Sequence, residues 1–548
     1  MPQAGKENAM KAVWKKAGVP GIAILCVSLL AFGASGSMVG CGSGSPTPTE
    51  GGTFVSGLAA SPTSLDPAQL QDEQDYQVAK QLYDCLTAYD PKTMEVKPAI
   101  AGSWDASGDL TVFTFHLRPG VAFHNGDACL ARDFVYSWNR AVLPETAAAA
   151  SFRFSMIKGF AEVQAGTARE LSGLQAPDDY TLQVTLSGAF AEFPAVVAHP
   201  CFAPVPQSVL SEAGNAGFSD RATGTGPFKL NVWQHESQIV LDKNPDYYGS
   251  DRPHLDQLIF KIYPDEISAY QDFQNGLLQD APIPAGQFLD ARSSFGDRAI
   301  FNPVIGVVFL GFNMNAEPWK SSPQMRRALN NAVDRDVLAG MVADESRAPA
   351  TGILPSGMPG FQPGAMPYNY DPGKAADLLY QAGFPGGQGL PGITLGYTNT
   401  ADNQRIADAL RREFSATGVN LITQGFDPVT YTALVQAGQL TFFRFAWRPD
   451  YPIGDALLFP LFFSGNAGGN NLTNYNNPDV DELLESARSE KNRDKRWQLY
   501  RDAEGKILED APVMPLLFYQ TARVIAGNVQ GYLRTAQDDT PYKLVYIK

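Results

Sequence analysis

Few residues in this chain stand at spacings that could support catalysis. Ser155 and Lys158 match a Ser-x-x-Lys pattern, in which the lysine can take the proton of a serine nucleophile. Penicillin-recognising enzymes combine this pattern with a downstream Lys-Thr-Gly or Ser-Asp-Asn, and the chain has neither. An exported serine hydrolase built on this pair is therefore a minor alternative.

Other catalytic signatures are missing. The sequence contains no Gly-x-Ser-x-Gly elbow, no His-Glu-x-x-His and no phosphate-binding loop. Gly224-Thr-Gly-Pro227 lacks the third glycine of a nucleotide loop and predicts a tight turn into a strand over 228–230. The histidines show no metal-ligand spacing; they are His116, His124, His199, His235 and His254. We therefore expect a protein without metal or cofactor that is not an enzyme.

The first 40 residues differ from the rest in composition. Four lysines precede the apolar run Ile22–Phe32, and the small residues of Gly33–Ser37 follow, which is the order of a secretory signal. The span from Ala17 to Val39 is also just long enough for an uncleaved membrane anchor, although Gly and Ser dilute it. We expect residues 1–40 to be an export signal.

A possible acylation site follows the apolar run. Met38-Val-Gly-Cys41 and the Gly/Ser/Pro/Thr-rich segment after it resemble a bacterial lipobox and its tether. The resemblance implies a diacylated Cys41 as the mature N-terminus, with residues 41–52 as a flexible tether. Two acyl chains suffice for stable extracytoplasmic attachment to the bacterial cell membrane.

Net charge and cysteine content narrow the possible classes of protein. The formal charge is −15, and residues 1–40 carry +3, which leaves −18 on the remainder. So acidic a chain is not expected to bind nucleic acid. Cys85, Cys129 and Cys201 remain beyond the tether. We expect one disulfide and one free thiol among them, with the pairing left open.

Hydrophobic periodicity predicts an α/β fold. Residues 110–117 and 180–186 alternate apolar and polar side chains, as half-buried strands do. Ser-Pro, Asp-Pro and Asn-Pro pairs open three predicted helices, over 323–341, 372–382 and 478–487. Their apolar stripes predict core-facing surfaces.

Several blocks of sequence together resemble a known family. The run Ala106–Gly126, continued by Ala131–Ser137, is similar to the signature of family 5 extracellular solute-binding proteins, the peptide- and nickel-type binding components of ABC importers. Further blocks agree in order along the chain: Ser64–Pro67, Gly224–Phe228, Asn244–Tyr248, Arg252–Asp256, Met325–Arg335, Tyr370–Leu379 and Trp447–Pro452.

This resemblance implies a two-lobed periplasmic-binding-protein-like clamp of class II with an extra inserted domain. The ligand would lie between two lobes that close by hinge bending. An ABC permease and its ATPase would be the partners of a monomeric protein. The expected boundaries are lobe I over 53–98, 222–306 and 515–548, an inserted domain over 99–221, and lobe II over 307–514.

The resemblance also implies ligand-binding residues. Asp450 aligns with the aspartate that peptide binders use for the ligand's α-ammonium group, and a carboxylate suits a three-donor cation. Alternatively, Asp450 caps a turn before Pro452. Arg444 aligns with an arginine that faces the ligand's carboxylate in some oligopeptide binders, or it is an ordinary strand arginine.

Neighbouring residues complete the expected site. Trp447 and Tyr451 would supply aromatic walls, unless they belong to the core. Arg448 departs from the family pattern, so it could favour an acidic ligand or point outward. Ser61 and Thr63 are expected to approach the cleft from lobe I.

Short peptides are the first ligand hypothesis, because Asp450 and Arg444 suit the two ends of a zwitterionic chain. An oligosaccharide, a nickel complex or haem is the alternative within the same family. A surface sensor with the same fold stays open.

Overall fold

A computed structural model describes residues 48–342 and 347–548, and the contacts below lie within the unit Pro48–Lys548. The expected export signal over residues 1–40 and the expected acylation site at Cys41 lie outside the described residues. No helix within the described ranges is long and apolar enough to cross a membrane.

A mixed sheet forms the framework of the described chain. Its strand order is β15-β14-β16-β12-β17-β11-β1-β10-β9-β8, and β13 pairs with β17 outside this path. The strands are β1 (Thr53–Leu58), β8 (Phe228–Gln234), β9 (Gln238–Lys243), β10 (Gln257–Ile262), β11 (Asp280–Pro282), β12 (Ala299–Phe312), β13 (Arg347–Pro349), β14 (Ile393–Thr398), β15 (Leu421–Phe426), β16 (Phe442–Trp447) and β17 (Val513–Ile525).

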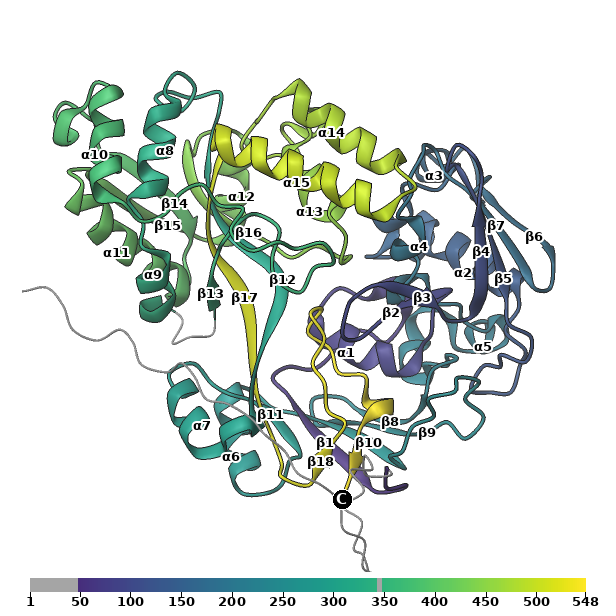
Figure 1. Ribbon diagram of the computed structural model, residues 1–548. Helices are drawn as coiled ribbons and strands as arrows, with labels where there is room; N and C mark the ends of the chain where they lie inside the picture. The colour runs from purple at the N-terminus through teal and green to yellow at the C-terminus, as the bar shows by residue number, and fades with distance from the viewer. Residues whose placement is uncertain (1–47, 343–346) are drawn as a thin grey trace, which may run out of the picture. The chain divides into compact units, whose positions relative to one another are not determined.

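Strands β12 and β17 join the two lobes. They pair antiparallel over most of their lengths; at one end β17 also pairs with β11, and at the other β12 pairs with β16. In Figure 1 both run from the upper group of elements to the lower group. The register shifts between Val304 and Val307, which marks a bulge between the two halves of the sheet. The two-lobed α/β clamp expected from the sequence is confirmed.

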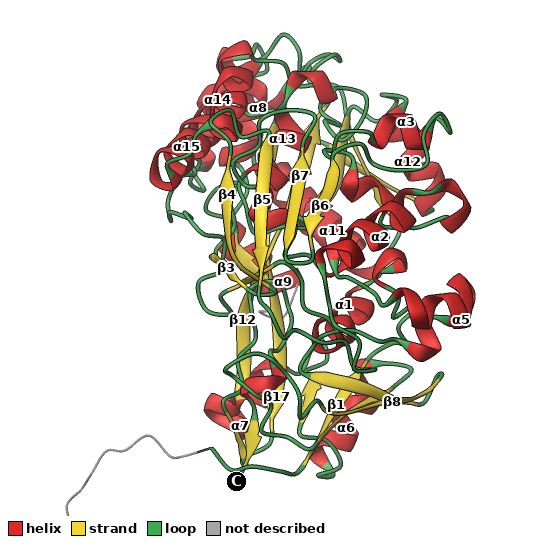
Figure 2. Ribbon diagram, turned by 90° about the vertical axis from the view of Figure 1, so that its right-hand side faces the viewer, coloured by secondary structure: helices red, strands yellow, loops and turns green. Residues whose placement is uncertain are grey.

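A separate four-stranded sheet lies between β1 and β8 in the sequence. Its order is β4-β5-β7-β6, and its strands stand together in the upper part of Figure 2. The strands predicted over 110–117 and 180–186 are β5 and β7. Phe113, Phe115 and Val184 pack with Trp138 of α2 in a core of their own. The strands and helices are β4 (Ala101–Ala106), β5 (Val112–Leu117), β6 (Leu174–Asp178), β7 (Thr181–Thr185), α2 (Ala131–Val142), α3 (Phe160–Gln164), α4 (Phe193–Val196) and α5 (Gln207–Gly217), with the 3-10 turn η3 (Ser151–Phe154).

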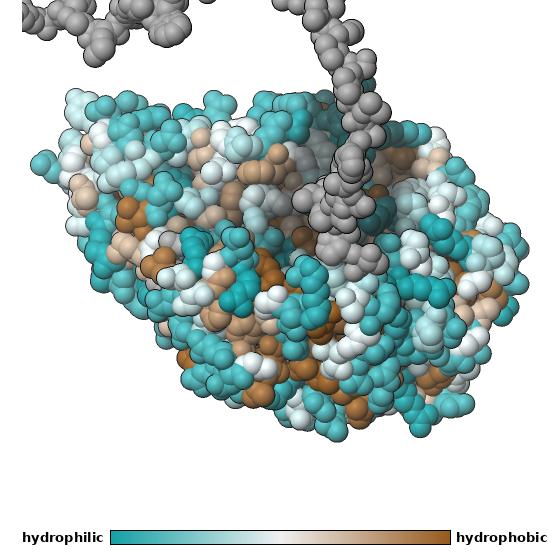
Figure 3. Space-filling view, turned by 60° about the horizontal axis from the view of Figure 1, so that its bottom comes forward, coloured by the Kyte–Doolittle hydropathy of each residue, from teal (hydrophilic) through white to brown (hydrophobic). Residues whose placement is uncertain are grey.

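Helices cover both faces of the main sheet. Along β12, Val308 and Leu310 belong to one core, whereas Val307 and Phe309 belong to another, because side chains alternate along a strand. The helices are α1 (Glu73–Leu82), α6 (Glu266–Gln274), α7 (Phe288–Phe295), α8 (Pro323–Asn331), α9 (Arg335–Val342), α10 (Pro372–Gln381), α11 (Ala401–Ala416), α12 (Pro428–Gln436), α13 (Asp455–Phe462), α14 (Pro478–Ser489) and α15 (Arg493–Asp510). Two short pairs complete the fold: β2 (Thr87–Tyr89) with β3 (Val96–Pro98), and β18 (Val529–Gln530) with β19 (Tyr546–Ile547). On the face shown in Figure 3 hydrophilic residues predominate and hydrophobic ones gather in small patches.

The predicted helix starts are confirmed, but one helix is shorter than expected. The side chains of Ser322, Asp371 and Asn477 cap α8, α10 and α14. The helix predicted over 323–341 is two helices, because α8 ends at Asn331 and α9 begins at Arg335. The buried Arg335 guanidinium donates to the carbonyl oxygens of Asn330 and Pro515, so it satisfies backbone groups at the break.

The expected disulfide is wrong. Cys85, Cys129 and Cys201 are all buried free thiols. Cys129 and Cys201 belong to the core of the inserted sheet, whereas Cys85 packs in the core of lobe I. Each behaves as a small apolar side chain, and burial raises the pKa of all three thiols.

Candidate ligand-binding cavity

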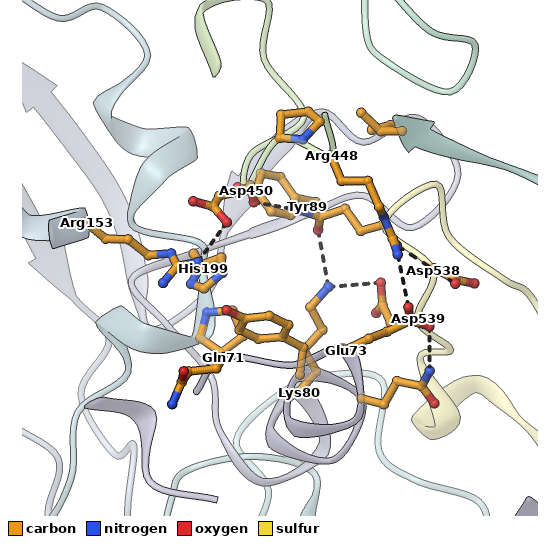
Figure 4. Close-up of a pocket in the computed structure, with 16 residues that line it drawn as sticks. Gln71, Glu73, Lys80, Tyr89, Arg153, His199, Arg448, Asp450, Asp538 and Asp539 are labelled. Carbon is orange, nitrogen blue, oxygen red and sulfur yellow. Dashed lines mark hydrogen bonds and ion pairs between the residues drawn. The ribbon is translucent and has the colours of Figure 1, made fainter. Parts of the chain in front are cut away.

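A cavity of about 250 Å³ lies where α1, the inserted domain and the segment after β16 meet. Figure 4 shows its polar side chains directed toward one another. The lining residues are Gln71, Glu73, Tyr76, Gln77, Lys80, Tyr89, Arg153, His199, Pro200, Ile305, Arg448, Pro449, Asp450, Gln537, Asp538 and Asp539. Elements far apart in the sequence therefore supply its charges.

Asp450 forms an ion pair across the cavity. Its Oδ1 accepts a hydrogen bond from Nη2 of Arg153 at 2.8 Å, and Figure 4 shows the two side chains meeting. Gln537 donates to the backbone oxygen of Asp450 at 3.3 Å, which holds the loop after β16. Although burial opposes the charge, Asp450 holds the pKa of Arg153 above its ordinary value. The carboxylate is thus fixed in the cavity and already faces a cation.

Arg448 reaches the opposite side of the cavity. Its Nη1 donates to Oε2 of Glu73 at 3.0 Å, and Nη2 lies 4.0 Å from Asp538. Asp538 also accepts from Nε of the buried Arg534 at 2.8 Å. Burial and the nearby Asp538 charge raise the pKa of Glu73, whereas Arg534 keeps the pKa of Asp538 low despite burial. Arg448 therefore points into the cavity rather than outward.

Lys80 separates this cavity from a second one. Its Nζ lies 2.9 Å from Asp539 and donates to Gln537 at 3.2 Å. Lys80, Gln537 and Asp539 also line a neighbouring cavity of about 780 Å³. The two cavities share a wall made of this ion pair.

A neutral wall stands beside Asp450. His199 is buried, which lowers its pKa well below the ordinary value, so the ring is uncharged at neutral pH. Its Nδ1 accepts a hydrogen bond from the backbone of Cys201 at 3.3 Å. The Tyr76 ring meets it edge-on at 5.0 Å.

Arg444, Trp447 and Tyr451 are close in sequence to Asp450 but do not line the cavity. Trp447 donates to Ala456 at 2.9 Å and packs in the core of lobe II. Tyr451 packs against His199 and the core of the inserted domain.

Arg444 lies on β16. Its Nε is buried without a hydrogen-bond partner among the described residues. Burial lowers the pKa of Arg444, although Tyr519 opposes the shift. Such a guanidinium lacks the carboxylate that usually accompanies a buried cation.

Ser61 and Thr63 also lie outside the cavity lining. Thr63 donates from its backbone nitrogen and its hydroxyl to the buried Asp75. Asp75 receives further backbone hydrogen bonds at the start of α1. The contacts of Thr63 thus fix the approach to α1.

Most of the cavity's charged residues were missed from the sequence. Arg153 stands in a short 3-10 turn without a motif, so the sequence carries no signal for its role. Lys80 and Glu73 lie on α1. Polar as well as apolar residues of this helix are buried, so the sequence does not show which of its faces meets the cleft. For Arg448 the one signal in the sequence is its position two residues before Asp450.

Comparison with known proteins identifies the group. The family model of bacterial extracellular solute-binding proteins, family 5 Middle, matches residues 95–469. This chain belongs to that family. The family 5 match spans the inserted sheet, β12 and the segment that carries Asp450.

Several relatives match most of this family 5 chain. The dipeptide-binding protein DppE of Bacillus subtilis (strain 168) is 30% identical over 491 residues, which is 86% of this chain and 88% of that protein. The oligopeptide-binding protein OppA of the same organism is 26% identical and covers 98% of this chain and 100% of its own. The murein tripeptide-binding protein MppA in its unliganded open form superposes with a TM-score of 0.82 at 25% identity, covering 92% of this chain and 99% of that chain.

The family membership decides between the classes considered above. The relatives are substrate-binding proteins of transporters, so this family 5 chain is an extracytoplasmic solute-binding protein of the ABC-importer type and not an enzyme. Ser155 and Lys158 lie outside the cavity lining. Both residues are exposed in the segment after η3, and no hydrogen bond links these two described residues.

Proposed function

We propose that this protein captures short peptides between its two lobes and delivers them to a membrane permease driven by its ATPase. One observation carries the proposal: of the ligand residues expected from the family resemblance, Asp450 alone lines the cavity. The names of relatives support it, since they are a dipeptide-binding, an oligopeptide-binding and a glutathione-binding protein.

Asp450 is proposed to face the amino end of the peptide. Arg153 donates a hydrogen bond to Oδ1 of Asp450 only, and no described residue donates a hydrogen bond to Oδ2. An N–H group of the ligand would complete this carboxylate. Lobe closure would then remove water and strengthen the hydrogen bond.

Arg444 is proposed to face the carboxyl end. A guanidinium grips a carboxylate through two parallel hydrogen bonds, and the buried Nε of Arg444 has a free donor. Trp447, Tyr451, Ser61 and Thr63 are proposed to act through packing around the cleft.

The remaining features of the proposal concern the whole chain. Residues 1–40 are proposed as the export signal, 41–52 as the tether and Cys41 as the acylated residue of a monomeric lipoprotein. The lobe boundaries are proposed as given above, with β12 and β17 as the hinge strands.

Calorimetric titration tests this function. The chain beginning after Cys41 is titrated with di- to hexapeptides, alongside Asp450→Ala and the exposed control Asp297→Ala. We expect at least one peptide to bind to the unchanged protein and to the control. Binding to Asp450→Ala should be at least tenfold weaker, because it loses a charge-assisted hydrogen bond of about 1.5–3 kcal/mol. Unchanged binding to Asp450→Ala would contradict the proposal.

A further inference from the structure

The Arg153–Asp450 ion pair changes what the cavity requires of a ligand. The Arg153 side chain is only 8% exposed and the Asp450 side chain 36%, so the pair stands at the boundary between core and cavity. The Arg153 guanidinium lies over the Phe152 ring at 4.5 Å, and its Nε is buried without a hydrogen-bond partner among the described residues. The arginine is therefore held in place by packing as well as by the carboxylate.

The position of Arg153 in the chain supports a fixed orientation. It belongs to η3 of the inserted domain, and its backbone nitrogen donates to Ala150 at 3.0 Å. Phe154, the next residue, is fully buried against Trp138 and Phe202. The turn that carries Arg153 is thus anchored in a core and cannot easily withdraw the guanidinium when a ligand enters.

Charge balance extends over the whole cavity. Each of its acids has a basic partner among the described residues: Asp450 has Arg153, Glu73 has Arg448, Asp538 has Arg534 and Asp539 has Lys80. A ligand ammonium group would find no carboxylate that lacks a cation. Placed beside Asp450, it would also lie next to the Arg153 charge, and like charges at such distances repel strongly once water is removed.

We propose that Arg153 is a specificity-determining residue, and that the Arg153–Asp450 pair selects peptides whose amino end carries no positive charge, such as N-acylated peptides. This inference rests on the proposed function. The second oxygen of Asp450 accepts the amide N–H of the first residue, and the free Nη1 of Arg153 donates to a ligand carbonyl oxygen. A neutral amide offers one donor and one acceptor, which matches what this pair leaves available. A free ammonium group also binds there, but it gains less affinity than it would from a carboxylate that has no cationic partner.

Pairs of peptides that differ only at the amino end test the inference. Each peptide that binds in the titrations described above is compared with its N-acetylated form, starting with trialanine. The proteins are the unchanged chain, Arg153→Gln, Arg153→Lys and the double variant Arg153→Gln/Asp450→Asn. Arg169→Gln is the matched control, because Arg169 forms an exposed ion pair with Glu145 in the same domain.

The measured quantity is the ratio of the dissociation constants of the acetylated and free forms. For the unchanged protein, Arg153→Lys and Arg169→Gln, the ratio should lie below about 1, because the acetylated form binds more tightly. Arg153→Gln leaves Asp450 without its cation, so the ratio should rise at least tenfold, and the double variant should return it to the original range. Loss of packing alone would weaken both forms equally and leave the ratio unchanged.

Two results would overturn the inference while leaving the proposed function standing. One is an unchanged protein that binds free peptides more tightly than acetylated ones, and this comparison does not depend on the folding of any variant. The other is an equal ratio in Arg153→Gln and the unchanged protein. If no peptide of either form binds to the unchanged protein, the proposed function fails and this inference falls with it.

Discussion

Replacing Glu192 with glutamine should make the protein more resistant to rising pH. Glu192 belongs to the inserted domain and is 5% exposed. Its Oε2 accepts from the hydroxyl of Tyr500 at 2.7 Å, and its Oε1 lies 3.3 Å from Nε of Arg496. That Arg496 nitrogen makes no hydrogen bond with a described residue, so the buried pair is poorly aligned. Burial raises the pKa of Glu192 to about 7, although Arg496 opposes the shift.

The sign and size of the effect follow from this pKa. The unfolded chain releases the proton near the ordinary pKa of 4.5, whereas the folded protein keeps it until about 7. Between these values the folded state binds more protons, so its stability falls as the pH rises through this window. The difference corresponds to roughly 3 kcal/mol. Glutamine resembles the protonated form and does not titrate. The free energy of unfolding of the variant should therefore fall by roughly 3 kcal/mol less than that of the unchanged protein over this pH range.

Thermal and urea unfolding at about pH 4 and pH 8 measure this difference. For a chain of this length the entropy of unfolding is about 1 kcal/mol per degree. The Tm of Glu192→Gln, measured relative to that of the unchanged protein, should therefore be about 3 °C higher at pH 8 than at pH 4. The exposed control Glu162→Gln should gain nothing. If Glu192→Gln becomes less stable relative to the unchanged protein at high pH, the charged pair stabilises the fold and the reasoning is wrong.

Three further predictions concern other parts of the chain. Asp280→Ala should lower the free energy of unfolding by about 3–5 kcal/mol in urea, because it leaves the buried Arg523 guanidinium without its carboxylate. Arg169→Ala, which breaks an exposed pair, should change it by less than about 1 kcal/mol; equal effects would contradict the role of burial. Gly306→Ala should cost about 1–3 kcal/mol and weaken peptide binding, since its Cβ would lie 2.8 Å from side chains at the bulge of β12; a neutral result would show that the bulge adapts. Cys41→Ser should move the protein from the membrane fraction to the released fraction, and an unchanged distribution would contradict acylation.

The fold followed from the sequence because its signals are local or repeated. Alternating side chains marked the strands later found as β5 and β7, and proline pairs marked the starts of α8, α10 and α14. The end of α8 was missed because Arg335 stabilises it through distant carbonyl oxygens, including that of Pro515. The disulfide expectation failed because cysteine count carries no information on the core in which each thiol packs.

The site was less predictable than the fold. Asp450 was found because a family motif surrounds it, whereas its partner Arg153 lies almost 300 positions away in a turn with no pattern. Ser61 and Thr63 were expected at the cleft from alignment alone, but the buried Asp75 receives the hydrogen bonds of Thr63. Which charged side chains meet depends on the tertiary fold, and the periodicity of the sequence does not reveal these contacts.

Native mass spectrometry of the chain beginning after Cys41, purified without denaturation, tests the central claim most directly. The account predicts adducts whose masses are those of short peptides, lost on gentle activation and absent from Asp450→Ala. Adducts with the mass of an oligosaccharide, haem or a nickel complex, or peptide adducts that persist in Asp450→Ala, would contradict it.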